Sequence, residues 1–334
     1  MIGRIRRSGG GRPRKAQQDS ELAKSFEQLV CSHTAGCPVK GIQWTYLTVK
    51  ELKEKLAAKG HAVSRSVVYQ LLEQRQLGRR KMTKQLTMKT VEGRNEQFER
   101  IYALQHYYLS RGYAVLSIDV KKKEYLGRFY RPGTVLSTKA LPCYDHDFNS
   151  FASGRMVPHG IYDLLLNTGY MTLGTSADTA EFMVRCLRDW WTEHGCQQYD
   201  PNDPILILCD GGGANGSRNR LFKEQMQALA DETGLRFRLA HYPPYCSKYN
   251  PIEHLLFPSV SRAWSGVMLD SVQTAAQLLA QRNTTQKSGL KMVVQTCQRT
   301  YEKGKKVSPQ FLNNYSIAHD KILPNWNYRI IPTG

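Results

Sequence analysis

The sequence Tyr113-Ala-Val-Leu-Ser-Ile-Asp119 is an almost wholly apolar run that ends in a carboxylate. Residues 204–210, Pro-Ile-Leu-Ile-Leu-Cys-Asp, repeat this pattern. Short runs of this kind, rich in branched side chains, are typical of strands buried in a sheet. Functional groups in an open α/β sheet gather beyond the carboxyl ends of its strands. We therefore expect Asp119 and Asp210 to lie side by side.

Strands and helices alternate around these two runs. The expected helices lie at 177–194, 215–233 and 251–264, and the further strands lie at 127–131, within 157–176 and at 236–242. The resulting order, β-β-β-α-β-α-β-α, predicts an α/β domain over residues 113–265. Its mixed five-stranded sheet would be flanked by helices.

A third carboxylate, Glu253, opens the last expected helix. Three carboxylates in one cleft repel each other unless a hard cation neutralises them, and oxygen ligands suit Mg²⁺ or Mn²⁺. Two such ions could hold the attacking and leaving oxygens of an in-line displacement at phosphorus. We interpret Asp119, Asp210 and Glu253 as catalytic residues and metal ligands. A turn or capping role is the ordinary alternative for any one of them.

The chain is strongly basic, with 47 Lys and Arg against 28 Asp and Glu and a formal net charge of +19. This surplus indicates a polyanionic partner, with nucleic acid first and an anionic membrane surface second. No apolar run approaches the roughly 18 residues of a membrane span, and the basic N-terminus lacks the apolar core of a signal peptide. We expect a cytoplasmic, nucleoid-associated protein. Its eight scattered cysteines, with no CxxC pair, are expected to be free thiols.

Residues 1–40 are expected to form a flexible basic arm, and residues 41–112 a helical DNA-binding module with a bridging helix. A capping box at 48–51 and a second helix opening at Ser64 outline a helix-turn-helix, for which an ordinary helical hairpin is the alternative. The candidate DNA contacts are Arg12, Arg14, Lys15, Arg65, Tyr69, Arg79, Arg80, Lys81, Lys121, Lys122, Arg218 and Lys248. Alternating solvated strand residues are the equal alternative for the lysines after Asp119.

The segment Asp210-Gly-Gly-Gly-Ala-Asn-Gly216 is a turn with little side-chain bulk. Such a turn leaves the aspartate accessible and lets backbone N–H groups approach a phosphate. It lacks the Gly-Lys-Ser/Thr of a P-loop, and the chain has no GxGxxG, which argues against a nucleoside-triphosphate site. Residues 266–334 are expected to form a mixed extension that packs back on the core.

Six ordered segments carry a family likeness. They are Ser117-Ile-Asp-Val-Lys-Lys-Lys-Glu124, Gly160-Ile-Tyr-Asp163, Asp210-Gly-Gly-Gly-Ala-Asn-Gly-Ser-Arg218, Leu229-Ala-Asp-Glu-Thr-Gly-Leu235, Ser247-Lys-Tyr-Asn-Pro-Ile-Glu-His254 and Trp326-Asn-Tyr328. Together they resemble the Rhodopirellula-type group of bacterial insertion-sequence transposases. The stretch from Pro243 to Glu253 is also similar to the broader mariner superfamily.

This resemblance implies an RNase-H-like fold and DDE catalysis with Mg²⁺ or Mn²⁺. It also implies action on the inverted terminal repeats of an insertion sequence. Matched residue by residue, Asp119, Asp210 and Glu253 fall on the three acids of the family. The implied protein is a DNA transposase that cleaves and joins double-stranded DNA, expected to act as a homodimer. Two alternatives stay open: a non-catalytic DNA-binding protein derived from a transposase, and a structure-selective nuclease.

Overall fold

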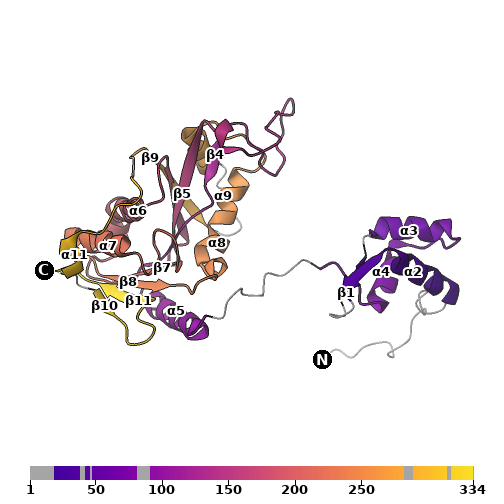
Figure 1. Ribbon diagram of the computed structural model, residues 1–334, viewed down its shortest axis with the longest axis horizontal. Coiled ribbons are helices and arrows are strands. Elements are labelled where there is room, and N and C mark those ends of the chain that lie inside the picture. The colour runs from indigo at the N-terminus through magenta and orange to yellow at the C-terminus, as the bar shows by residue number, and fades with distance from the viewer. Residues whose placement is uncertain are drawn as a thin grey trace. The chain divides into compact units, whose positions relative to one another are not determined.

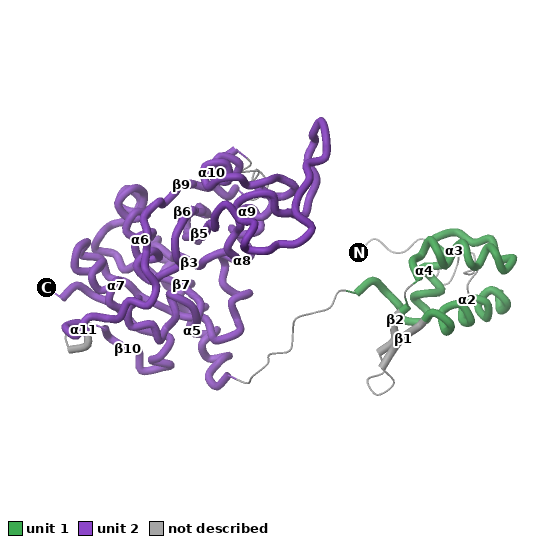
Figure 2. Tube along the Cα trace, turned by 45° about the horizontal axis from the view of Figure 1, so that its top comes forward, with its two compact units in different colours: residues 1–86 green, residues 87–334 purple. Residues whose placement is uncertain are grey.

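The computed structural model describes residues 19–37, 42–45, 47–80, 91–281, 289–313 and 317–333. The chain divides into two compact units, residues 1–86 and residues 87–334 (Figure 2). The boundary predicted at residue 112 therefore moves to residue 86. The physical reason is that helix α5 (Arg94–Leu109) packs through its apolar face on the sheet of the second unit.

The first unit contains the helices α2 (Ser20–Ser32), α3 (Val49–Ala58) and α4 (Arg65–Gln74) and a hairpin of β1 (Thr34–Cys37) and β2 (Ile42–Thr45). The capping box predicted for α3 is confirmed. The hydroxyl of Thr48 accepts a hydrogen bond from the Glu51 N–H at 3.2 Å, and the Glu51 carboxylate accepts one from the Thr48 N–H at 2.7 Å.

Helix α2 corrects the prediction of a flexible arm over residues 1–40. Its apolar side chains recur at helical spacing, and the carboxylate of Asp19 caps its first turn at 2.9 Å from the Leu22 N–H. Leu22 and Phe26 are buried against Leu52 of α3 and Val68 of α4. The three helices therefore share one small core.

The second unit is built on a mixed sheet (Figure 1). Its five central strands are β3 (Val115–Val120), β5 (Gly154–Asp163), β6 (Thr168–Gly174), β7 (Ile205–Cys209) and β8 (Phe237–His241). They lie in the order β6-β5-β3-β7-β8. Both pairings among β3, β5 and β6 are antiparallel, whereas β7 is parallel to β3 and to β8. The predicted α/β class and RNase-H-like mixed sheet are confirmed.

Further strands extend this sheet beyond the predicted five. They are β4 (Glu124–Leu126), β9 (Lys291–Cys297), β10 (Ile317–His319) and β11 (Asn327–Ile330). With them, the described residues form a nine-stranded sheet. Strand β9 pairs with β6 at one edge, and β11 pairs with β8 toward the other. The C-terminal extension thus supplies strands to both sides of the core.

Some predicted elements are wrong in their limits. The strand expected at 127–131 lies instead at 124–126, because Gly127 has a φ of +120° and turns the chain away from β5. The helix expected at 251–264 is divided into α8 (Pro251–Leu255) and α9 (Phe257–Ala263). Pro258 stands in the first turn of α9, where its missing N–H costs no helical hydrogen bond.

Helices cover both faces of the sheet (Figure 1). Helices α6 (Ala180–Glu193) and α7 (Arg220–Thr233) pack on one face. The opposite face is covered by α5 over β3, β7 and β8, and by α8, α9 and α10 (Val272–Gln281) over the β5–β6 side. Among the described residues, the remaining helical segments are α11 (Pro309–Asn313) and the 3₁₀ turns Asn149–Phe151, Gly195–Gln197 and Ser247–Tyr249.

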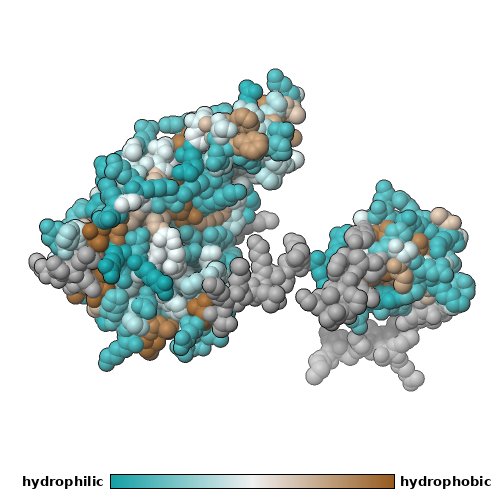
Figure 3. All heavy atoms as spheres, viewed as in Figure 1, coloured by the Kyte–Doolittle hydropathy of each residue, from teal (hydrophilic) through white to brown (hydrophobic). Residues whose placement is uncertain are grey.

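The surface seen in Figure 3 is largely hydrophilic, with scattered apolar patches. Residues 127–153, between β4 and β5, project from the sheet and expose Val135, Leu136 and Leu141. No helix in the described ranges is long and apolar enough to cross a membrane.

The C-terminal strand is joined to the core by a buried amide pair. Asn327 of β11 donates from Nδ2 to Oε1 of Gln97 at 2.6 Å, and Gln97 donates from Nε2 to the His241 carbonyl at 2.8 Å. Both amide side chains are fully buried. The neighbouring Tyr328 hydroxyl lies 2.9 Å from Nε2 of His241. These contacts connect α5, β8 and β11.

We predict that Asn327→Ala destabilises the protein by about 1–3 kcal/mol, because Gln97 would keep a buried acceptor without its donor. Urea unfolding followed by tryptophan fluorescence measures the change. The control is Asn149→Ala, whose side chain is exposed and whose removal should change the free energy of unfolding by less than about 0.5 kcal/mol. Equal unfolding midpoints for the two variants would contradict a supporting role for the amide pair.

Candidate active site

Asp119 and Asp210 lie side by side at the carboxyl ends of two central strands. Strands β3 and β7 are parallel neighbours, with Ser117 opposite Leu208. Each aspartate lies two residues beyond its member of that pair. The alternation of side chains places both on the face of α5 and α8, since Leu116 and Ile118 point to the opposite core. Both side chains are half-buried.

Glu253 reaches the same place from α8. This helix contacts β3 and β5, and Glu253 lies in its first turn. The Glu253 carboxylate lies close enough to Asp119 to raise the pKa of that carboxyl group. The structure thus brings together the three acids from a strand, a strand end and a helix.

The three acids strongly perturb one another. Burial raises the pKa of Asp119 well above its usual range, and the charges of Asp210 and Glu253 raise it further. Burial also raises the pKa of Asp210, again with help from the charge of Glu253. In the part of the chain that the structure describes, none of the three forms an ion pair with a basic side chain. A divalent cation would relieve this repulsion.

The chemistry of these donors fits a hard divalent ion. Among the described residues, no three His, Cys, Asp or Glu side chains are arranged as a ready-made ligand cage. Magnesium sites are commonly built from one or two carboxylates with waters and substrate phosphate oxygens. Asp119, Asp210 and Glu253 therefore fit a site whose coordination is completed by its substrate.

Close packing brings α8 down onto the sheet. A Cβ atom on Gly160 would lie 2.8 Å from the side chains of Ile252 and Phe257. One on Gly169, in the neighbouring strand, would overlap the side chain of Leu256. Glycine at these two positions lets α8 approach the strands closely, and with it Glu253.

Two polar residues that the sequence analysis did not single out lie beside the acids. The hydroxyl of Ser117 donates to Oδ1 of Asn250 at 2.5 Å, and Nδ2 of Asn250 donates to Oδ1 of Asp210 at 3.4 Å. Asn250 precedes Pro251, a common signal for the start of a helix. That signal locates the helix, but the direction of the amide depends on contacts with a distant strand.

The turn after Asp210 is held close to β8. A Cβ atom on Gly211 would lie 2.7 Å from the carbonyl oxygen of Tyr242, and Gly213 has a φ of +77°. The following helix starts at Arg220, later than the predicted 215, because Asn219 caps it. The segment between is a compact turn beside the acids.

The predicted DNA contacts differ in their surroundings. Lys121 is paired with Glu124 at 2.9 Å, and its side chain is only 14% exposed. Exposed predicted contacts are Arg65, Tyr69, Arg79, Arg80, Lys122, Arg218 and Lys248. The remaining ones, Arg12, Arg14, Lys15 and Lys81, lie outside the described residues.

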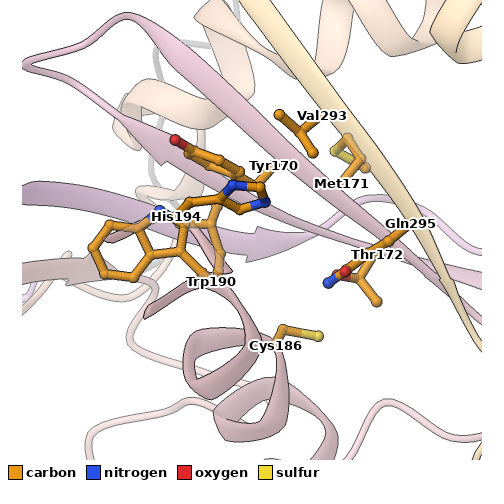
Figure 4. A pocket seen from close by; sticks show the side chains of 9 residues that line it. Tyr170, Met171, Thr172, Cys186, Trp190, His194, Val293 and Gln295 are labelled. Carbon is orange, nitrogen blue, oxygen red and sulfur yellow. The ribbon is translucent and has the colours of Figure 1, made fainter. Parts of the chain in front are cut away.

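A small cavity lies between α6, β6 and β9, where the rings of Tyr170 and His194 face each other above Cys186 (Figure 4). Its volume of about 10 Å³ suffices for roughly one water molecule. None of the three acids lines it. The acids at the strand ends therefore remain the candidate active site.

Comparison with known proteins gives one family. The family model described as "Rhodopirellula transposase DDE domain" matches residues 25–332. No curated protein matches the chain. Similar solved structures include the Mos1 mariner paired-end complex with Mn, at 16% identity over 85% of this chain and 76% of that chain, with a TM-score of 0.45. Another is the Mos1 strand transfer complex, at 16% identity over 85% and 75%, with a TM-score of 0.41.

We predict that Gly169→Ala destabilises the protein by about 1–3 kcal/mol, because the new methyl group forces Leu256 and α8 away from β6. Gly154→Ala is the matched control in the neighbouring strand, since its Cβ atom would meet Leu126 at an ordinary 3.5 Å. Thermal unfolding of both variants checks the difference. A Gly169→Ala protein as stable as Gly154→Ala would show that α8 can move without cost.

Proposed function

Because the chain belongs to the Rhodopirellula transposase DDE-domain family and is a DNA transposase, we propose that Asp119, Asp210 and Glu253 are its catalytic acids. The observation that carries this proposal is their convergence at the carboxyl ends of β3 and β7, where their charges act on one another. The two alternatives, a non-catalytic DNA-binding protein and a nuclease without strand transfer, are not favoured.

The proposed reaction is hydrolysis of a phosphodiester at the element's terminal repeats, followed by attack of the freed 3′-hydroxyl on target DNA. Asp119, Asp210 and Glu253 would hold divalent metal, with two Mg²⁺ or Mn²⁺ ions as the expected number. Bound there, the metal would activate the attacking oxygen and stabilise the leaving one. The acids themselves form no bond to phosphorus. Their task is to fix the geometry of an in-line displacement.

The protein supplies two further elements to the proposed site. The compact turn of residues 211–218 leaves backbone N–H groups and the exposed Arg218 beside Asp210, where a DNA phosphate would lie. Lys122 and Lys248 are exposed on the segments that follow Asp119 and precede Glu253. These cations would hold the DNA backbone without reading its sequence.

We further propose that the first unit binds the element ends. Helices α3 and α4 are joined by a short turn at Gly60, whose φ is +89°, and α4 exposes Arg65 and Tyr69. This arrangement fits a helix-turn-helix that offers its second helix to the major groove. Two ends must be brought together for strand transfer, which supports a homodimer on DNA.

We expect Asp119→Asn or Asp210→Asn to reduce cleavage of terminal-repeat DNA by roughly a thousandfold or more, because each removes a charged metal ligand. DNA affinity should be retained. The assay compares cleavage with Mg²⁺ and with EDTA, and Asp270→Asn, an exposed carboxylate, serves as the control. Undiminished cleavage by either aspartate variant would remove it from the site.

Replacing both Arg65 and Arg80 with glutamine should weaken DNA binding and reduce the salt dependence of the affinity. Removal of a single lysine or arginine that neutralises a phosphate lowers the slope of log K against log salt by about 1. Fluorescence anisotropy with labelled terminal-repeat DNA measures both quantities. The control is Lys53→Gln, an exposed cation on α3. If the double variant and the control have the same slope, neither Arg65 of α4 nor Arg80 beyond it contacts a DNA phosphate.

A further inference from the structure

We propose that Asn250 and Ser117 are positioning residues that hold the three acids in one arrangement and thereby set the affinity of the site for divalent metal. The inference rests on the proposed assignment of Asp119, Asp210 and Glu253 as metal ligands. It assigns a task to two buried polar side chains that neither touch the phosphate in the proposed reaction nor belong to the acids.

The side chain of Asn250 does not cap its own helix. Asn250 occupies the N-cap position of α8, where an asparagine side chain ordinarily accepts a hydrogen bond from the N–H groups of the first turn. Its side chain makes no such bond. Instead, the residue is fully buried and its amide points toward the strands. The amide is therefore used for tertiary contacts rather than to start its own helix.

Ser117 of β3 takes over the missing cap. Its hydroxyl oxygen accepts a hydrogen bond from the Ile252 N–H at 3.0 Å and donates to Oδ1 of Asn250 at 2.5 Å. Ser117 and Asp119 are two residues apart in the strand and so lie on the same face of the sheet. The first turn of α8 is thus anchored directly beside Asp119.

The amide group of Asn250 completes the connection to Asp210. Its Nδ2 donates to the carbonyl oxygen of Ile118 at 3.3 Å and to Oδ1 of Asp210 at 3.4 Å. The reverse orientation of the amide is excluded, because its oxygen would then face two acceptors. One buried side chain therefore joins the helix of Glu253, the strand of Asp119 and the carboxylate of Asp210.

Helix α8 is short and therefore depends on its contacts with Ser117 and Asn250. The helix has only five residues, far fewer than a helix needs for stability of its own in water. Its direction must be fixed by tertiary contacts, and Ser117 and Asn250 provide the polar ones. Residues that orient metal ligands typically change metal affinity by about 10–100-fold when they are replaced. Loss of either residue should therefore loosen Glu253 and Asp210 together.

The test measures metal binding without DNA. Mn²⁺ is titrated calorimetrically into the full-length wild type and into Asn250→Ala and Ser117→Ala. We expect a Kd about 10–100-fold higher for each variant. The double variant should bind Mn²⁺ no more weakly than the weaker single variant, because the two side chains act as one unit. A parallel rise in the Mg²⁺ concentration for half-maximal DNA cleavage is expected.

The matched control is Asn327→Ala. Asn327 is another fully buried, hydrogen-bonded asparagine, but it contacts none of the three acids. It should lower stability while leaving the Kd for Mn²⁺ unchanged, which separates positioning from general loosening. Should Asn250→Ala fail to fold, Ser117→Ala removes only a hydroxyl group and tests the same link.

The outcomes distinguish this inference from the proposed function. If Asp210→Asn abolishes Mn²⁺ binding while Asn250→Ala and Ser117→Ala bind like the wild type, the inference is overturned and the metal site stands. A wild type that neither binds Mn²⁺ nor cleaves terminal-repeat DNA overturns both. An equal loss of affinity in Asn327→Ala would also overturn the positioning role, because any buried amide would then have the same effect.

Discussion

Repulsion among three partly buried carboxylates is the constraint to which the second unit is adapted. Burial and mutual charge raise the pKa values of Asp119 and Asp210, so assembling the site without a cation works against folding. Apolar packing on both faces of the sheet offsets this cost. Leu116 and Ile118 are fully buried on one face, while Val115 is buried against α5 on the other. The aspartates thus end the most deeply packed strands.

Local patterns in the sequence predict the central elements well. The capping box of α3 and the apolar runs before Asp119 and Asp210 depend on neighbours in the chain, and the structure contains them. Strands β9 and β11 are not predicted, because their place depends on free edges offered by β6 and β8. In β9 the side chains are half-buried or exposed, and the apolar run Met292-Val293-Val294 is too short to mark a buried strand. A local sequence pattern does not show which distant strand a segment will pair with.

The same distinction applies to the candidate site. The carboxylates could be predicted, because each follows from its position at the end of a strand or the start of a helix. The contact between Ser117 and Asn250 could not, since it joins residues 133 positions apart and requires the amide to leave its usual capping role. The ion pair of Lys121 is likewise not apparent from its position two residues after Asp119. Glu124, three residues on, pairs with it in the structure, and its contact with a DNA phosphate stays a prediction.

These contacts explain why the residue beside Asp210 is an amide. A Lys or Arg at position 250 would relieve the repulsion of the acids, but its charge would then compete with the metal for them. An asparagine donates hydrogen bonds without adding charge, so the carboxylates are oriented and remain strongly attractive to a cation. Two of the three lysines that follow Asp119 form ion pairs with other carboxylates, Lys121 with Glu124 and Lys123 with Asp178 at 2.7 Å, whereas Lys122 is exposed. The arrangement thus leaves neutralisation of the acids to the cation that the proposed chemistry requires.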